Sequence, residues 1–147
     1  MKHILIASDL SPESLRPCKK VMEMAQLWSA KVTLLHVVQD LKIAPHGAPL
    51  APAMSSPDLD KDMEHARMAL ADQRAALGDS CAVETVVISS DQIPEAIDTY
   101  AEKHAVDLIA ISTHGRTGWR HLALGSVAEA VIRHAKVPVL TFPREPE

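Results

Sequence analysis

Residues 4–12 read Ile4-Leu5-Ile6-Ala7-Ser8-Asp9-Leu10-Ser11-Pro12 and predict a strand followed by a turn and a helix start. The four apolar residues predict a short strand that is buried on both faces, as in a parallel sheet. Polar residues Ser8 and Asp9 then end the strand. Ser11 followed by Pro12 indicates a helix start, because a serine hydroxyl caps free amides and proline has no N–H to leave unpaired.

The same alternation of strand and helix continues along the chain. β-branched apolar runs predict buried strands, and apolar residues at helical spacing predict helices. Expected strands cover 4–7, 31–38, 82–89, 106–112 and 137–142; expected helices begin at Pro12 and cover 58–77, 94–104 and 126–135. We therefore expect an α/β fold, a doubly wound parallel sheet with helices on both faces. A length of 147 residues suits one domain, 1–147.

Composition and charge narrow the class of protein. Hydrophobic residues make up 47% and charged residues 23%, which allows a packed core. A net charge of −4 gives no electrostatic footprint for nucleic acid. Cys18 and Cys81 lack CxxC spacing and are too few for a disulfide scaffold. The first apolar run is too short for a signal peptide, and no run approaches about 18 apolar residues, so we expect a soluble, cytoplasmic protein without membrane insertion.

Residues 40–57 fit neither pattern and are rich in Pro, Ala and Ser. We expect a long surface excursion there, a flexible loop. A mobile lid and an unstructured loop are both consistent with this composition.

Two loops leave the carboxyl ends of predicted strands, where open α/β sheets bind ligands. One runs from Ala7 to Ser11, and the other from Ser112 to Ser126 at a helix start. Three of the five glycines lie in the second loop: Gly115, Gly118 and Gly125. Glycine permits close approach of the backbone to a ligand, and a helix N-terminus suits phosphate. With Arg116 as a charge partner, the second loop predicts a phosphate cradle.

A structural role explains the same loop residues equally well. The glycines would then only shape a turn, and Ser126 with Glu129 has the spacing of a capping box. Neither GxxxxGK(S/T) nor GxGxxG occurs, which excludes a Walker-type loop and a dinucleotide fingerprint. The hydrolase elbow GxSxG is absent too.

A longer pattern resembles a known family. The run from Ser112 to Gly118, then 124–129, then 137–140, resembles the C-terminal signature of the universal stress protein family. The ATP-binding branch carries G-x2-G-x9-G-(S/T), and this chain has Ser112-x2-Gly115-x9-Gly125-Ser126. The resemblance covers essentially the whole chain. It implies a five-stranded, adenine nucleotide α-hydrolase-like fold that binds ATP and usually dimerises.

Carried over position by position, the resemblance implies an ATP site. Adenosine would contact Asp9 and the backbone of Ala7 and Val37, although Asp9 also suits a role in organising the turn before Ser11. The triphosphate would contact residues of the glycine loop and helix start: Ser112, His114, Gly115, Arg116, Gly125, Ser126 and Val127. Ser112 stands where the family has its first glycine, so its Cβ lies where the backbone should approach the nucleotide.

No catalytic residue is expected, and magnesium is expected only on ATP, with Ser126 as its hydroxyl neighbour. The final strand is expected at a sheet edge, which is an aggregation hazard unless it is paired. Together with the resemblance, this predicts a homodimer through Val137, Val139, Leu140 and Phe142.

The predicted function is therefore an ATP-binding sensor or regulatory module of the stress response with little or no turnover. Two alternatives stay open. One is a nucleotide-free dimeric interaction protein. The other is a slow enzyme that hydrolyses ATP or AMP or transfers AMP, against which no Ser-Gly-Gly pyrophosphate loop follows the first strand.

Overall fold

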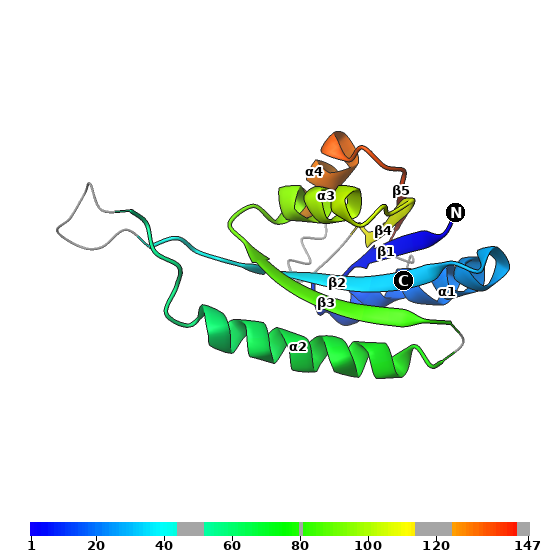
Figure 1. The fold of residues 1–147 in the computed structure, drawn as a ribbon, viewed down its shortest axis with the longest axis horizontal. Coiled ribbons are helices and arrows are strands. Elements are labelled where there is room, and N and C mark those ends of the chain that lie inside the picture. The colour runs from blue at the N-terminus through cyan, green and yellow to red at the C-terminus, as the bar shows by residue number, and fades with distance from the viewer. Residues whose placement is uncertain (44–51, 80, 114–124, 144–147) are drawn as a thin grey trace.

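A computed structural model of the chain describes residues 1–43, 52–79, 81–113 and 125–143. Within these ranges the strands form one five-stranded parallel sheet with helices on both faces (Figure 1). The strands are β1 (His3–Ala7), β2 (Lys31–Gln39), β3 (Val83–Ser90), β4 (Leu108–Ser112) and β5 (Val139–Phe142). The helices are the 3-10 helix η1 (Pro12–Leu15), α1 (Arg16–Trp28), α2 (Leu59–Ala76), α3 (Ile93–Lys103) and α4 (Ser126–His134). The predicted α/β fold class is confirmed.

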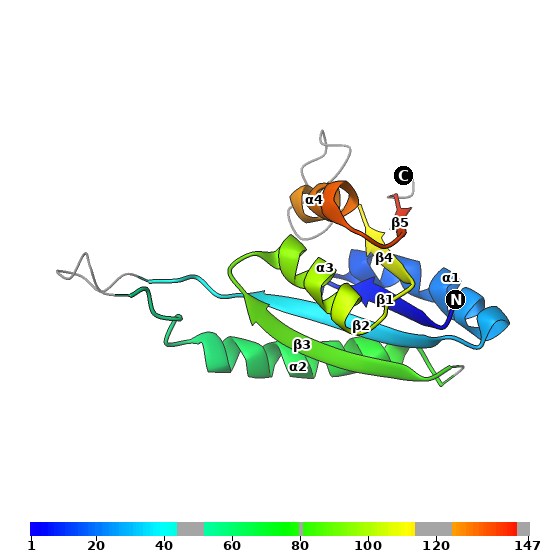
Figure 2. The ribbon, with the colours of Figure 1, turned by 45° about the horizontal axis from the view of Figure 1, so that its top comes forward.

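The strand order is β3-β2-β1-β4-β5, so β1 is central and β5 lies at one edge. Alternate residues of a strand point to opposite faces of the sheet. Ile4 and Ile6 pack in one aliphatic layer with α1 and α2, while Leu5 and Ala7 pack in a second layer with α3 and α4. Figure 2 shows α3 and α4 on one side of the sheet and α2 on the other. The sheet is therefore doubly wound, as the alternation of elements predicts.

Local signals place the ends of the elements close to the prediction. The Ser11 hydroxyl accepts a hydrogen bond from the Ser14 amide at 3.3 Å and caps η1, which continues into α1. Gly78 follows α2 with φ +70°, a conformation that favours glycine. β5 begins at Val139 rather than at 137, because Pro138 has no N–H to donate to the ladder.

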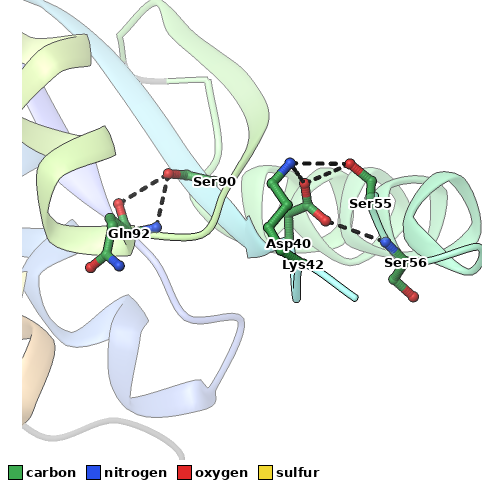
Figure 3. A network of polar contacts seen from close by, with 6 residues as sticks. All are labelled: Asp40, Lys42, Ser55, Ser56, Ser90 and Gln92. Carbon is green, nitrogen blue, oxygen red and sulfur yellow. Dashed lines mark hydrogen bonds and ion pairs between the residues drawn. The ribbon is translucent and has the colours of Figure 1, made fainter. Parts of the chain in front are cut away.

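Asp40 ties the two described ends of the 40–57 segment together (Figure 3). Its Oδ2 accepts from Lys42 Nζ at 2.6 Å and from Ser55 Oγ at 2.8 Å, and its Oδ1 accepts from the Ser56 amide at 3.4 Å. The hydrogen bonds from Lys42 and Ser55 lower the pKa of the Asp40 carboxyl. Residues 44–51 lie outside the described residues, so the flexible loop at 40–57 stays a prediction.

The two cysteines are free thiols that differ in burial. Cys18 is buried in the layer of α1 and α2, and burial raises its pKa to about 12. Cys81 is partly exposed, with its Sγ 3.2 Å from Met22 Sδ. Among the helices described, none combines the length and the apolar character needed to cross a bilayer.

Candidate functional site

The candidate site lies where β1 and β4 end side by side. β1 leads to α1 on one face of the sheet, and β4 leads to α4 on the other, so the winding direction changes between these neighbours. Ligands of open α/β sheets bind at such a point, beyond the carboxyl ends of the strands. Ala7 is in register with Leu35 of β2 and Ile111 of β4. The two predicted loops therefore start side by side, at the carboxyl ends of β1 and β4.

β2 continues past the end of β1, so the carboxyl ends of the two strands are offset. We call this offset the step. Beyond Leu35, within the part of the chain that the structure describes, β2 pairs only with β3, as far as Gln39 with Ser90. In the step, His36 Nδ1 lies 2.8 Å from the Ser8 carbonyl oxygen, and the Ser8 amide donates to the Leu35 carbonyl at 2.9 Å. The backbone after β1 is thereby held against the extended part of β2.

The predicted adenosine contacts all lie at this step. Ala7 ends β1, and Val37 lies on the extended part of β2 with its side chain buried toward α3 and α4. Asp9 is half-buried, and its Oδ1 accepts from the Ser11 amide at 3.0 Å and from Ser11 Oγ at 2.5 Å. The structural role considered for Asp9 is therefore real, and it fixes the position of the carboxylate.

The predicted phosphate end begins at Gly125, the residue before α4. Its amide donates to the Thr113 carbonyl at 2.6 Å, and a Cβ at position 125 would lie 3.1 Å from that same oxygen. Gly125 has φ −70° and ψ 146°, a conformation open to any residue. The glycine is thus needed for close approach to Thr113 and not for a special backbone angle.

The capping box predicted at Ser126 is wrong. Gly125 occupies the N-cap position and has no side chain to cap the helix, and Ser126 is the first helical residue. The Glu129 carboxylate instead accepts from Arg133 at 2.8 Å, while the Glu129 amide donates to the Gly125 carbonyl at 2.9 Å. The amides of 126–128 precede this first ladder bond, and helix-start amides of this kind suit an anion.

Ser112 and Thr113 connect the predicted phosphate end to β5, the strand at the edge of the sheet. Ser112 ends β4 in register with Phe142 of β5. Both the amide and the hydroxyl of Thr113 donate to the Phe142 carbonyl, at 3.0 Å and 3.3 Å. His114, Gly115 and Arg116 lie outside the described residues, so their predicted phosphate contacts stay predictions.

Comparison with known proteins decides the family. The profile described as "Universal stress protein family" (Usp) matches residues 1–143. The chain belongs to the universal stress protein family. Its similarity to universal stress protein A homolog 1 of Coxiella burnetii is 32% identity over 146 residues, covering 95% of this chain and 94% of that protein.

Solved structures show the same fold as this universal stress protein. The structure of the hypothetical protein MJ0577 of Methanocaldococcus jannaschii has a TM-score of 0.78 at 26% identity, covering 99% of this chain and 98% of that one. A universal stress protein from Archaeoglobus fulgidus, solved in complex with dAMP, has a TM-score of 0.67 at 22% identity, covering 96% of each chain. The predicted five-stranded fold of the family is confirmed.

Three side chains behind the site of this universal stress protein escaped the sequence analysis. Ser8, Ser14 and Gln73 are buried and hydrogen-bonded to one another beneath the turn that carries Asp9. One feature of the sequence could have indicated Gln73. It follows Ala66 and Leu70 at helical spacing, which makes it a polar residue on the otherwise apolar face of α2. Among the described residues, no group of three or more His, Cys, Asp or Glu side chains is placed to hold a metal ion.

Proposed function

We propose that this universal stress protein binds an adenine nucleotide, ATP, at the carboxyl ends of β1, β2 and β4. It acts there as a cytoplasmic sensor or regulatory module of the stress response, with little or no turnover. The observation that carries the proposal is the junction of Gly125 with Thr113, where the missing Cβ brings the start of α4 close to the end of β4. The dAMP complex of the Archaeoglobus fulgidus protein supports an adenine nucleotide as the ligand.

The phosphate end fits an anion by its backbone. The N-terminus of α4 carries the positive end of the helix dipole, and its first amides precede the helical ladder. Gly125, Ser126 and Val127 supply the backbone there, and the Ser126 side chain is exposed. ATP supplies the triphosphate that brings magnesium, an ion that keeps most of its waters and takes phosphate oxygens, with the Ser126 hydroxyl beside it.

The adenosine end fits a nucleoside by its hydrogen-bonding groups. Adenine and ribose offer N–H and O–H donors, which the Asp9 carboxylate accepts. Ser11 holds that carboxylate through Oδ1. Beside the end of β1, β2 continues beyond Leu35, and Val37 lies on this extended part. The two ends lie at one sheet edge, as an elongated nucleotide requires.

A binding role without turnover agrees with how the nearby carboxylates are used. Glu129 pairs with Arg133, and Asp9 receives both donors of Ser11. A hydrolytic enzyme needs a base placed to activate water or a hydroxyl. These carboxylates instead stabilise a helix face and a turn.

Calorimetry with purified protein tests the proposal. ATP is expected to bind with a dissociation constant in the micromolar range or below, and GTP at least tenfold more weakly. Release of phosphate from bound ATP is expected to stay near the uncatalysed rate. Failure of ATP, ADP and AMP to bind at millimolar concentration would contradict the proposed function, and rapid release of phosphate would contradict the absence of turnover.

We also propose that the protein is a homodimer joined along β5. Its residues Val139 to Phe142 are half-buried in one chain, and among the described residues they pair on one side only, with β4. Val139 and Leu140 are apolar for a strand at an edge, and pairing with the same strand of a second copy closes that edge. Val137 and Phe142 flank this contact.

A further inference from the structure

We propose that Gln73 of α2 is a positioning residue for the nucleotide site. It holds the turn from Ser8 to Ser11 in the conformation that presents Asp9 to the nucleoside. The inference rests on the proposed function, because Asp9 is a nucleotide contact only if that function is correct. Gln73 itself lies behind the turn, and within the described part of the chain its hydrogen bonds go to Ser8, Ser11 and Ser14, none of which is a predicted nucleotide contact.

The side-chain amide of Gln73 makes one hydrogen bond to each end of the turn. Its Oε1 accepts from Ser8 Oγ at 2.7 Å, and its Nε2 donates to the Ser11 carbonyl at 3.2 Å. These partners lie 65 and 62 residues away in the sequence. An uncharged side chain that both donates and accepts at this length is a glutamine. Each contact holds the turn at one of its ends.

Ser11 in turn is hydrogen-bonded to Asp9. While its carbonyl is held by Gln73, Ser11 donates its amide and its hydroxyl to Asp9 Oδ1. A shift of Ser11 therefore moves the carboxylate. Two successive contacts, with Ser11 between them, thus connect the Gln73 side chain to the Asp9 carboxylate.

The turn needs such support because its backbone is strained. Leu10 has φ +66°, a left-handed conformation that a leucine rarely adopts. The Leu10 amide donates to Ser8 Oγ at 3.0 Å, and the same hydroxyl donates to Gln73. Ser14 Oγ lies 2.9 Å from Ser8 Oγ and donates to the Ser11 carbonyl at 2.7 Å. Strained conformations persist where the surrounding contacts over-determine them.

Packing of α2 alone does not account for a glutamine at this position. The buried face of α2 otherwise consists of Ala66 and Leu70, with Leu77 partly buried beyond them. A buried amide is costly unless hydrogen bonds satisfy it, so an apolar residue would serve packing better. The amide is explained by the turn that it contacts.

The test is a double-mutant cycle on ATP affinity. Gln73→Met keeps the length of the side chain and removes its hydrogen bonds, while Met63→Leu on the same helix serves as the matched control. We expect Gln73→Met to weaken ATP binding five- to twentyfold and the control to leave it unchanged. In an Asp9→Ala background, Gln73→Met should have no further effect. Unchanged ATP affinity, or an undiminished effect in that background, would overturn the inference.

Amide hydrogen exchange without nucleotide separates this inference from the proposed function. Faster exchange at Leu10 and Ser14 in Gln73→Met, but not in Met63→Leu, supports the hold on the turn. Unchanged exchange at both amides overturns it, whatever the nucleotide result. If the wild type binds no adenine nucleotide, the proposed function fails and the nucleoside part of the inference fails with it.

Discussion

The turn after β1 and the junction before α4 meet at the same sheet edge, but different groups hold them. Side chains hold the turn, namely those of Ser8 and Ser11 in the turn itself and that of Gln73 in α2. Backbone groups hold the junction, where the Gly125 amide contacts the Thr113 carbonyl. Side-chain contacts are removed one at a time by substitution, whereas a backbone contact is blocked as soon as a Cβ is added. The two ends of the site should therefore respond differently to mutation.

The largest effect is expected from Gly125→Val at the junction. A Cβ there lies 3.1 Å from the Thr113 carbonyl oxygen, so the start of α4 must shift away from β4. Loss of two or more charge-assisted contacts of about 1.5–3 kcal/mol each should weaken ATP binding at least a hundredfold. Calorimetry measures the affinity, and circular dichroism checks that the variant is folded.

Gly125→Ala is the matched control for this substitution. Its φ of −70° suits alanine, so only the close contact distinguishes it from glycine. We expect an intermediate loss of affinity. ATP affinity equal to wild type in a folded Gly125→Val protein would contradict the proposed placement of the triphosphate at the start of α4.

The next largest effect concerns assembly, because the junction is attached to the edge strand. Thr113 donates twice to Phe142 of β5, so the proposed dimer strand also supports the proposed phosphate end. Val139→Lys should place a charge in the proposed interface and raise the dimer dissociation constant at least tenfold. Sedimentation at micromolar concentration measures it, with Ile132→Lys on the exposed side of α4 as control. A monomeric wild type would contradict the proposed dimer.

A smaller effect is expected at the turn from Ser8→Ala. The substitution leaves Gln73 Oε1 and the Leu10 amide without the hydroxyl that they contact. Each buried polar group left unsatisfied costs about 1–3 kcal/mol. We expect urea unfolding to show a loss of this order, while ATP binding weakens less than in Gly125→Val. A larger loss of affinity than at the junction would reverse the comparison between the two ends.

The sequence alone predicts the fold and the position of the turn after β1. Buried runs such as residues 4–7 and the start at Ser11-Pro12 are local signals, and the structure confirms them. The cap at Ser126 was misplaced because the Gly125 amide bonds to Thr113, which shifts the helix start by one residue. Gln73 was missed because its partners come from a distant turn, and no local pattern reports such contacts.

The smallest effect on the site is expected at the opposite end of β1, from His3. Its Nδ1 lies 3.0 Å from the His104 carbonyl oxygen and its Nε2 lies 2.8 Å from Thr33 Oγ1. A carbonyl oxygen only accepts, so Nδ1 carries the proton and Nε2 accepts from the threonine hydroxyl. Burial lowers the pKa of His3 below its ordinary value of 6.5. The neutral ring is the form that fits the fold.

The direction of the pH dependence follows from that shift. When the pKa is lower in the folded state, the unfolded chain binds the proton more readily, so the stabilisation is complete above a pH of about 6.5. It declines as the pH falls through that value toward the folded-state pKa. Between pH of about 7.5 and 5.5, urea unfolding should therefore show a larger loss of stability in the wild type than in His3→Gln. ATP affinity at fixed pH should be the same in both, because His3 lies at the amino end of β1 and the site at its carboxyl end. Equal loss of stability in the two proteins would assign the pH dependence to other groups.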